Sequence, residues 1–235
     1  MMKEEIINIV RPKVVLIDVY ETILDMYEIE RRLDALFNNR TAFPLWMELL
    51  TKYMMADNST PAFHDFIAIA ETTLRMTAET MHHDISDEHI SEVLLLMRHL
   101  PVKEAVQEGL SSLIDHGFIV AALTNVPEQI VLDRMERTGL ISYFEKILCA
   151  EQVKKYKPAK EVYDWAAKTL RVKANEVLLT SAHDWDIAGA ANVGMKTALI
   201  KLQDQVIYSL TPQPDFTCKS LTDLAIQLAA LPQSN

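Results

Sequence analysis

A short apolar run that ends in an acid constrains the fold of this chain more than any other segment. Residues 14–17 read Val-Val-Leu-Ile, Asp18 follows, and the sequence then turns polar. Buried strands of parallel sheets have this continuous apolar character, and open α/β folds place their ligands at the carboxyl ends of such strands. Asp18 is therefore expected at the ligand-binding edge of a sheet.

Further along the chain, apolar runs alternate with amphipathic segments of helix length. We expect strands at residues 14–17, 118–123, 146–150, 177–180 and 197–200, and helices at 103–116, 128–138 and 160–170. Such alternation is typical of right-handed βαβ units. The sequence therefore predicts an α/β fold, a doubly wound parallel sheet with a Rossmann-like core. After Gln213, one edge strand and a final helix over 221–231 are expected.

The interval between the first two predicted strands is too long for a simple loop. Its apolar residues recur at helical spacing, and polar breaks occur at 38–39, 57–59 and 82–84. Loops longer than about 15 residues without secondary structure are uncommon inside compact domains. We therefore predict an inserted helical cap domain at 26–98, and an α/β core domain made of 1–25 and 99–235.

The composition limits the partners and the location of the protein. Lys and Arg number 23 against 33 Asp and Glu, and the formal net charge of -10 repels a phosphate backbone, so no nucleic-acid partner is expected. The apolar runs fall short of the roughly 18 residues that a membrane span requires, and the N-terminal segment carries acids where a secretory signal carries bases. We expect a cytoplasmic protein without membrane association. Cys149 and Cys218 are expected to be core thiols.

Four polar segments follow predicted strands and would meet at one edge of the sheet. They are Asp18 to Thr22, Thr124-Asn125, Lys157-Pro158 and Ser181 to Asp186. Each alone has an ordinary structural explanation: a strand-end acid often forms a turn, Thr-Asn before a proline starts a helix, and a lysine beside a proline usually lies in solvent. The acids of the fourth segment could simply favour the positive end of the next helix. The common order and spacing of the four segments favour a functional site.

Together these segments resemble the motifs of the haloacid dehalogenase superfamily, and they are most similar to those of the L-2-haloacid dehalogenases. The first motif of those enzymes has the form Asp-x-Tyr-Gly-Thr-Leu, and residues 18–23 read Asp-Val-Tyr-Glu-Thr-Ile. Two further segments also look like the dehalogenase versions: Tyr156-Lys157-Pro158 followed by Val162-Tyr163, and Ser181 to Asp186 followed by Gly189-Ala190. The resemblance covers nearly the whole chain, including the position of the helical insertion.

The resemblance implies a hydrolase that acts on a small 2-haloacid through an aspartate nucleophile. Asp18 would attack the halogen-bearing carbon, and Lys157 would keep Asp18 ionised. Asp186 would pair with Lys157 and orient or deprotonate the water that cleaves the resulting ester, and Thr22 would assist. The implied substrate-binding residues are Tyr20, Thr124, Asn125, Tyr163, Ser181 and His183. A homodimer formed through the cap helices is also implied.

The residue at position 20 separates two kinds of enzyme with this pattern. Phosphatases of the superfamily carry a second aspartate there, because an alkoxide leaving group is a strong base that profits from a general acid. Halides other than fluoride are such weak bases that they leave without a proton. Tyr20 therefore favours displacement at a carbon–halogen bond over phosphoryl transfer.

The fourth segment gives a second reason to prefer the dehalogenase reading. Mg²⁺ binds carboxylate oxygens, and phosphatases of this pattern carry two acids four residues apart on that segment. If Asp186 is the second acid, Ala182 occupies the place of the first. No metal or other cofactor is expected. Two alternatives stay open: a phosphatase of small metabolites that needs Mg²⁺, and a catalytically silent binding module of the same fold.

Met47 departs from the dehalogenase pattern in the predicted cap. It stands where the arginine that binds the substrate carboxylate is expected, and a methionine cannot make a charge-assisted pair with a carboxylate. Arg32 or Arg40 is an alternative clamp, although a surface position is the favoured interpretation of both. The cap is also rich in methionine, which favours gap-filling core over an apolar substrate surface; the residues concerned are Met54, Met55, Met76, Met81 and Met97.

Two further departures lie in the predicted core. Glu21 replaces the glycine of the first motif, where glycine permits positive φ, so either the turn relaxes or Glu21 takes part in the site. His183 replaces an asparagine of the fourth motif. It would donate a hydrogen bond to Asp18 or, as the less favoured alternative, act as the base for the hydrolytic water near neutral pH.

Overall fold

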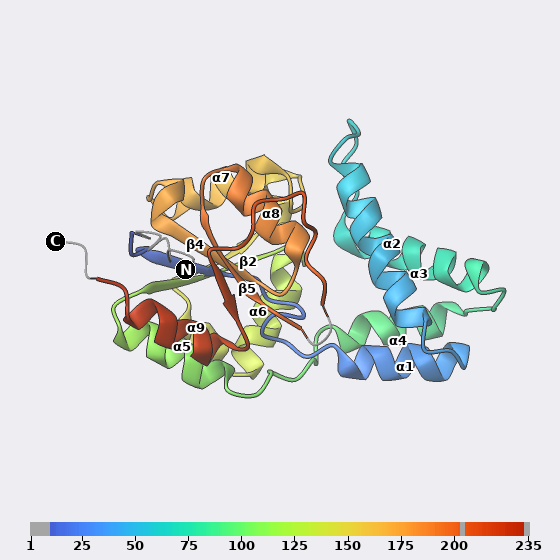
Figure 1. Ribbon diagram of the computed structural model, residues 1–235. Coiled ribbons are helices and arrows are strands. Elements are labelled where there is room, and N and C mark those ends of the chain that lie inside the picture. The colour runs from blue at the N-terminus through green and yellow to red at the C-terminus, as the bar shows by residue number, and fades with distance from the viewer. Residues whose placement is uncertain (1–9, 203–204, 233–235) are drawn as a thin grey trace, which may run out of the picture.

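The computed structural model describes residues 10–202 and 205–232 and places them in two parts, a sheet covered by helices and a separate group of helices (Figure 1). The sheet has the order β3-β2-β1-β4-β5-β6, and all of its neighbouring strands pair in parallel. The strands are β1 (Val14–Ile17), β2 (Ile119–Thr124), β3 (Lys146–Cys149), β4 (Val177–Ser181), β5 (Lys196–Ile200) and β6 (Phe216–Cys218). The predicted α/β class is therefore confirmed.

The central strand β1 explains why the chain folds in this way. All four of its residues are fully buried, as a strand with helices on both faces requires. Because side chains alternate along a strand, Val15 and Ile17 join one hydrophobic cluster while Val14 and Leu16 join the cluster on the opposite face. The chain leaves β1 for β2 on one side and later returns to β4 on the other. The carboxyl ends of β1 and β4 thus flank the topological switch point, where open α/β folds bind ligands.

Five helices cover the two faces of the sheet. They are α5 (Val106–Asp115), α6 (Glu128–Arg137), α7 (Lys160–Thr169), α8 (Asp184–Asn192) and α9 (Leu221–Ala229), and short 3-10 turns lie at Leu140–Tyr143, Ala150–Val153 and Ala174–Glu176. Buried residues of α5, α6 and α9 belong to one hydrophobic cluster, and those of α7 belong to the other. Figure 1 shows α7 and α8 on one side of the sheet, with α5 and α9 on the other. The edge strand and helix expected after Gln213 are present as β6 and α9.

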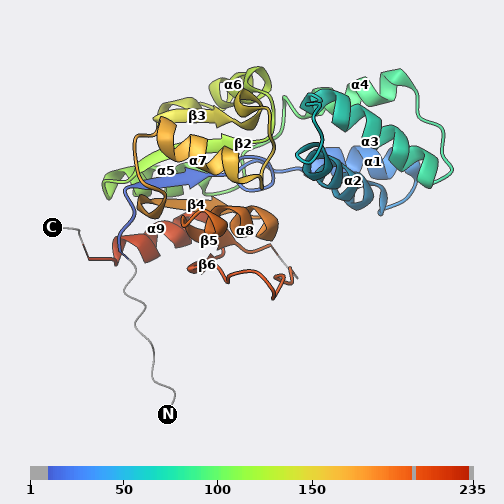
Figure 2. The same cartoon turned by 90° about the horizontal axis from the view of Figure 1, so that it is seen from above.

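The helical insertion lies beside the carboxyl edge of the sheet. It consists of α1 (Tyr27–Phe37), α2 (Ala42–Asp57), α3 (Phe66–Thr80) and α4 (Asp87–Leu96), and Figure 2 shows these helices grouped apart from the strands. The chain enters and leaves this cap along adjacent paths, because Leu24 forms a bridge with Val102 and the Asp25 amide donates to the Pro101 carbonyl at 2.8 Å. Both crossings therefore share one narrow junction.

A second contact joins the cap to the core. Asn58, just after α2, accepts a hydrogen bond from the Tyr156 amide through Oδ1 and donates to the Tyr156 carbonyl through Nδ2, both at 2.8 Å. The Tyr156 hydroxyl donates to the His64 carbonyl at 2.7 Å, and the Phe63 ring stacks on Tyr156. Tyr156 directly precedes Lys157, so the loop between α2 and α3 holds the backbone next to one of the predicted catalytic residues.

None of the helices within residues 10–202 and 205–232 combines the length and the apolar character that crossing a bilayer would demand.

Cys149 and Cys218 are free and buried, as expected of core thiols, and burial raises the pKa of each thiol to about 12. Neither is therefore a thiolate near neutral pH.

Candidate active site

The four polar segments converge on one buried ammonium group. Lys157 Nζ donates to Asp18 Oδ1 at 2.7 Å, to Asp186 Oδ2 at 2.6 Å and to the Leu123 carbonyl at 3.1 Å. Lys157 is only 1% exposed. The interpretation of Lys157 as a surface lysine beside a proline is therefore wrong.

The charges in this cluster support one another. Burial opposes the charge of Asp18, but Lys157, the nearby His183 and the hydrogen bonds to the carboxylate outweigh it and hold the pKa of Asp18 below its usual value. Burial likewise opposes the charge of Lys157, and the two carboxylates beside it overcome this effect and raise the pKa of Lys157. Asp18 and Lys157 are therefore both charged at neutral pH.

The second oxygen of Asp18 is held by the segments that follow β1 and β4. The Thr22 hydroxyl donates to Asp18 Oδ2 at 2.6 Å, and the Ser181 hydroxyl donates to the same oxygen at 3.4 Å. Thr22 in turn accepts a hydrogen bond from the Ala182 amide at 2.9 Å. Asp18 is thus fixed by both flanking segments, as a pre-oriented nucleophile requires.

Asp186 lies deeper than Asp18. Its Oδ2 accepts from Lys157, and its Oδ1 accepts from the Tyr163 hydroxyl at 2.6 Å. Gly189, one turn along α8, makes this arrangement possible, because a Cβ atom there would lie 2.6 Å from the Tyr163 hydroxyl. Asp186 and Tyr163 are both fully buried. The geometry gives Asp186 the role of holding Lys157 in place.

The residues predicted to bind substrate fall into two groups. Tyr20, Thr124, Asn125 and His183 line a cavity in front of Asp18. Tyr163 and Ser181 are fully buried and do not belong to its lining. Direct substrate contact by these two does not agree with the geometry, because their hydroxyls point to Asp186 and Asp18.

Thr124, the last residue of β2, and Asn125, which follows it, line the cavity. Asn125 Oδ1 accepts from the Lys157 amide at 2.8 Å, so the second and third motifs hold each other. The Thr124 hydroxyl accepts from the Val126 amide at 3.1 Å and fixes the turn into α6. Because both side chains are buried, the loop after β2 and the loop that carries Lys157 keep fixed positions relative to each other although they are far apart in sequence.

Glu21 and His183, the two core departures from the dehalogenase motifs, lie together. The turn has not relaxed, because Glu21 keeps a φ of 64°, in the left-handed region that favours glycine. His183 Nδ1 lies 3.7 Å from Glu21 Oε2, and His183 Nε2 lies 3.7 Å from Asp18 Oδ2. The imidazole also stacks on the Trp185 ring. The Glu21 carboxylate therefore lies beside the imidazole, at ion-pair distance but beyond hydrogen-bond distance.

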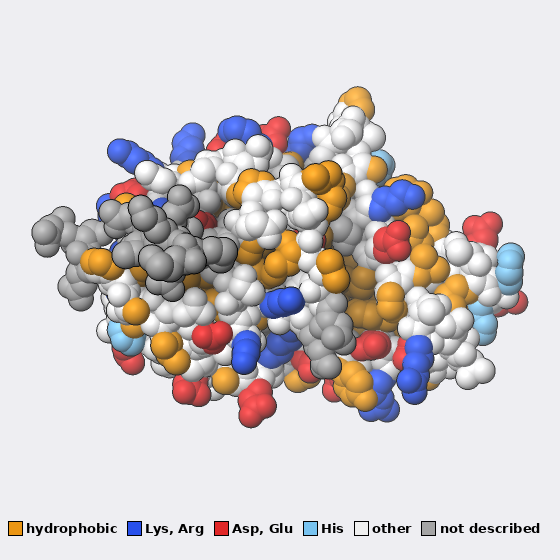
Figure 3. All heavy atoms as spheres, in the orientation of Figure 1, with side chains coloured by type: hydrophobic (Ala, Val, Ile, Leu, Met, Phe, Trp, Pro, Cys, Tyr) orange, Lys and Arg blue, Asp and Glu red, His pale blue; other side chains and the backbone are white. Residues whose placement is uncertain are grey.

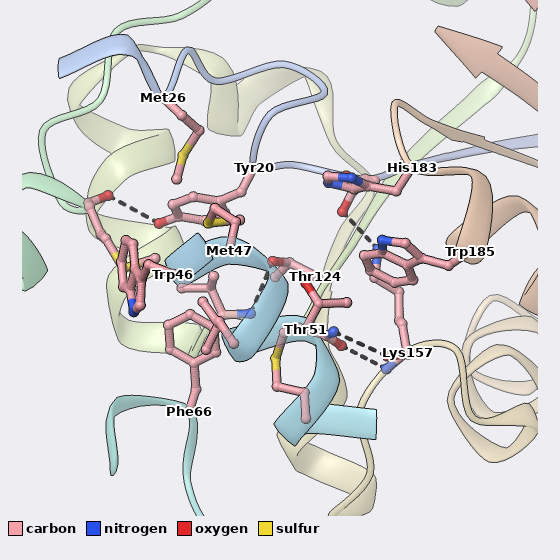
Figure 4. A pocket seen from close by; sticks show the side chains of 16 residues that line it. Tyr20, Met26, Trp46, Met47, Thr51, Phe66, Thr124, Lys157, His183 and Trp185 are labelled. Atoms are coloured by element: carbon pink, nitrogen blue, oxygen red, sulfur yellow. Dashed lines mark hydrogen bonds and ion pairs between the residues drawn. The ribbon is translucent and has the colours of Figure 1, made fainter. Parts of the chain in front are cut away.

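The cavity itself is small and mostly apolar. It encloses about 60 Å³ between core and cap, and Figure 4 shows Tyr20, Trp46, Met47, Phe66 and Trp185 around it. In Figure 3, hydrophobic side chains gather where the two parts meet. The full lining comprises Asp18, Tyr20, Met26, Trp46, Met47, Leu50, Thr51, Met54, Phe66, Met97, Thr124, Asn125, Val126, Lys157, His183 and Trp185.

The sequence did not single out several of these wall residues. Trp46 and Phe66 follow ordinary helical spacing, and nothing in that spacing separates a cavity wall from a core position. Met54 and Met97 were expected to fill the core; both are buried and also line the cavity. Arg32 pairs with Glu92, and Arg40 is exposed, so neither of the alternative clamps lines the cavity.

The donor set around Asp18 does not suit Mg²⁺. Lys157 Nζ occupies the space between the two carboxylates, and both oxygens of Asp186 already accept hydrogen bonds. Within the described part of the chain, no three His, Cys, Asp or Glu side chains are grouped to hold a metal ion. A hard cation would have to displace the buried ammonium group.

Comparisons with known proteins agree with this fold. The chain is 26% identical to the (S)-2-haloacid dehalogenase of Pseudomonas sp. strain YL over 206 residues, 87% of this chain and 89% of that protein. It is 27% identical to the pyrophosphatase PpaX of Bacillus anthracis over 180 residues, 74% and 78% of the two chains. The structure of the L-2-haloacid dehalogenase from Xanthobacter autotrophicus superimposes with a TM-score of 0.86 at 18% identity, over 94% of this chain and 100% of that one, and shows the shared fold.

A family model described as haloacid dehalogenase-like hydrolase matches residues 15–200. The resemblance expected from the motifs is thereby confirmed. The chain belongs to the haloacid dehalogenase-like hydrolases.

Proposed function

We propose that the protein hydrolyses the carbon–halogen bond of a small organic halide through an ester on Asp18. The observation that carries this proposal is the ionised Asp18, held by Lys157 and Thr22 and facing an apolar cavity. The similarity to proteins named 2-haloacid dehalogenases supports it and makes the 2-haloacids the first substrates to consider.

In the first step, an oxygen of Asp18 attacks the halogen-bearing carbon from the side opposite the halogen. The new C–O bond forms as the carbon–halogen bond breaks, and the halide leaves with the bonding electron pair. No proton is needed for a halide. Tyr20 agrees with this, because its hydroxyl donates to the Met97 carbonyl at 3.1 Å and burial raises its pKa above the usual value. It is a neutral wall of the cavity.

In the second step, water attacks the carbonyl carbon of the Asp18 ester. Asp186 is a poor base for this water, because it is fully buried and both of its oxygens are engaged. His183 lines the cavity, and its Nε2 lies 3.7 Å from Asp18 Oδ2. We therefore assign the base to His183, which was the less favoured alternative from sequence. Glu21, 3.7 Å from Nδ1, would stabilise the imidazolium that forms.

His183 transfers the protons of this step. Nε2 takes one proton from water as the hydroxide oxygen bonds to the ester carbon. When the tetrahedral intermediate collapses, the same proton passes to the departing alkoxide and gives the alcohol. The second proton of the water remains on the Asp18 carboxyl group; it passes to His183 Nε2 and from there to solvent. Asp18 is then again a carboxylate paired with Lys157, and each turnover releases one alcohol, one halide and one proton.

The first experiment separates dehalogenase, phosphatase and silent binding module. The protein is incubated with charged and neutral bromoalkyl compounds and with an aryl phosphate, each in EDTA and in Mg²⁺. We expect halide release in EDTA, and its complete loss in Asp18→Ala. Phosphate release that requires Mg²⁺, without halide release, would favour the phosphatase that the PpaX similarity suggests. No turnover of any compound would favour the binding module.

Replacing Lys157 tests what its positive charge contributes to the ionisation of Asp18 and to the stability of the fold. The pKa of Asp18 is depressed, so its ionisation stabilises the fold above about pH 4 and this contribution is lost as pH falls through the depressed pKa. In Lys157→Met, burial raises the pKa instead, and two buried carboxylates lose their partner. We expect the acid limb of kcat/KM to move to higher pH, and the unfolding free energy to fall by about 3–5 kcal/mol.

The matched control is Lys160→Met, which removes an exposed lysine from its pair with Asp164. Urea unfolding should show a loss of at most about 0.5 kcal/mol for this variant. Equal losses in the two variants, or an unmoved acid limb in Lys157→Met, would contradict the role given to Lys157.

Replacing His183 separates the two chemical steps. His183→Phe keeps an aromatic ring beside Trp185 and removes the base. We expect one equivalent of halide in a burst, followed by turnover slowed by about 10²–10⁴-fold, with the ester visible on Asp18 by intact mass. Glu21→Gln should slow ester hydrolysis less than His183→Phe does. His99→Phe, at an exposed histidine, is the control. Unchanged steady-state turnover in His183→Phe would show that another group deprotonates the water.

A further inference from the structure

The walls of the cavity define a substrate class, an inference that rests on the function proposed above. We infer that the natural substrate is a small, neutral, apolar organic halide and that a carboxylate beside the reacting carbon is disfavoured. Three independent features of the cavity carry this inference: its lining, its charge balance and its size.

The cap contributes apolar side chains where a charged substrate would need a partner. Trp46, Met47 and Phe66 come from α2 and the start of α3 and surround the cavity in Figure 4. Met54, also on α2, and Asp18 belong to the same lining. The Trp46 indole N–H is already used, since it donates to the Ala70 carbonyl at 3.2 Å. Thr51, also on α2, is the one other polar side chain that the cap brings to the lining within the described residues. A substrate carboxylate in this space would lose its hydration and gain at most one neutral hydroxyl donor from the cap.

The cation at the cavity floor has no free donor. Among the described residues, Lys157 is the one lysine or arginine in the lining, and its ammonium group has three N–H donors. These match its three acceptors, which are Asp18 Oδ1, Asp186 Oδ2 and the Leu123 carbonyl. Lys157 therefore activates the nucleophile and has nothing left with which to bind a second anion.

The net charge around the reacting atoms is negative. Asp18 and Asp186 face one lysine, so the cluster carries one excess negative charge. His183 lies between Asp18 and Glu21, so even its protonated form is balanced by Glu21. Lys103 donates to the Glu21 carbonyl and also faces Asp25, whose charge offsets its own. Arg98 and Arg134 act on Tyr20 from outside the cavity lining. A carboxylate placed beside Asp18 would thus meet net repulsion from the groups that face it there, whereas a neutral halide would not.

Size narrows the class further. The cavity of about 60 Å³ is well below the roughly 150 Å³ of an apolar protein cavity that accepts benzene. Short, unbranched chains fit this space and leave the carbon open to attack by Asp18. The flexible thioethers of Met47 and Met54 adapt to differences in chain shape. The geometry therefore favours short-chain halides that differ in shape but lack charge.

The first test compares substrates that share a carbon skeleton. Halide release is measured for 2-bromopropionate, 2-bromopropionamide and 1-bromopropane, and each kcat/KM is divided by the rate constant of the same compound with free acetate ion. We expect the normalised values of both neutral compounds to exceed that of the acid by at least about tenfold. Equal values, or a preference for the acid, would overturn the inference while leaving the dehalogenase function in place.

A charge-restoring variant tests the same point from the protein side. Met47→Arg places a cation in the cavity wall, and Met55→Arg adds the same charge to α2 outside the lining. We expect Met47→Arg to raise the ratio of acid to amide turnover by at least tenfold, and Met55→Arg to leave it within about twofold. An unchanged ratio in a folded Met47→Arg protein, verified by circular dichroism, would count against the inference.

A binding measurement separates this inference from the proposed function. Thermal stabilisation of the wild-type protein by 1-butanol is compared with that by butyrate, since a ligand that binds the folded state raises the melting temperature. Greater stabilisation by the neutral ligand supports the inference even if no halide is ever released, in which case the proposed function alone fails. Greater stabilisation by butyrate, or none by either ligand, would overturn the inference.

Discussion

One buried ammonium group between two buried carboxylates organises this protein. A charge as deeply buried as that of Lys157 is tolerated only where its partners are fixed at hydrogen-bond distance. Asp18 follows β1, Asp186 lies in the first turn of α8, and Lys157 comes from the loop before α7. The positions of the sheet, the two loops and Gly189 must therefore match closely, because a small displacement of any one of them would break the hydrogen bonds of Lys157 to the two carboxylates. The fold must satisfy these positions, and in the proposed mechanism the same cluster keeps Asp18 ionised for its attack on the substrate.

The strands and the main helices of the core could be predicted from the sequence because their signals are local. Val14–Ile17 is apolar throughout, and only burial on both faces explains such a strand. The burial of Lys157 could not be read from its neighbours, since a Lys-Pro pair carries no sign of the two distant acids. The pairing of Asn58 with Tyr156 likewise depends on cap and core packing, for which no local pattern exists.

Which residues line the cavity could not be predicted from sequence patterns. Trp46 and Phe66 have the spacing of core residues, and spacing alone does not show which of the buried positions face an open space. The motif resemblance implied substrate contacts for Tyr163 and Ser181, whereas in the structure their hydroxyls donate to Asp186 and Asp18. Glu21 and His183 lie far apart in sequence, and only the fold shows that these departures are neighbours.

These departures together change the chemistry that the scaffold supports. In the proposed mechanism His183 is the base on the cavity side of Asp18, with Glu21 beside it, while Met47 gives the cavity an uncharged wall where the motif resemblance implies an arginine. All of it depends on a covalent ester at Asp18. A single turnover in heavy-oxygen water, with enzyme in excess over an organic halide, tests that ester most directly. Hydrolysis through the ester places heavy oxygen in the Asp18 carboxylate, found by peptide mass spectrometry, and light oxygen in the alcohol; heavy oxygen in the alcohol with an unlabelled Asp18 would contradict an ester intermediate.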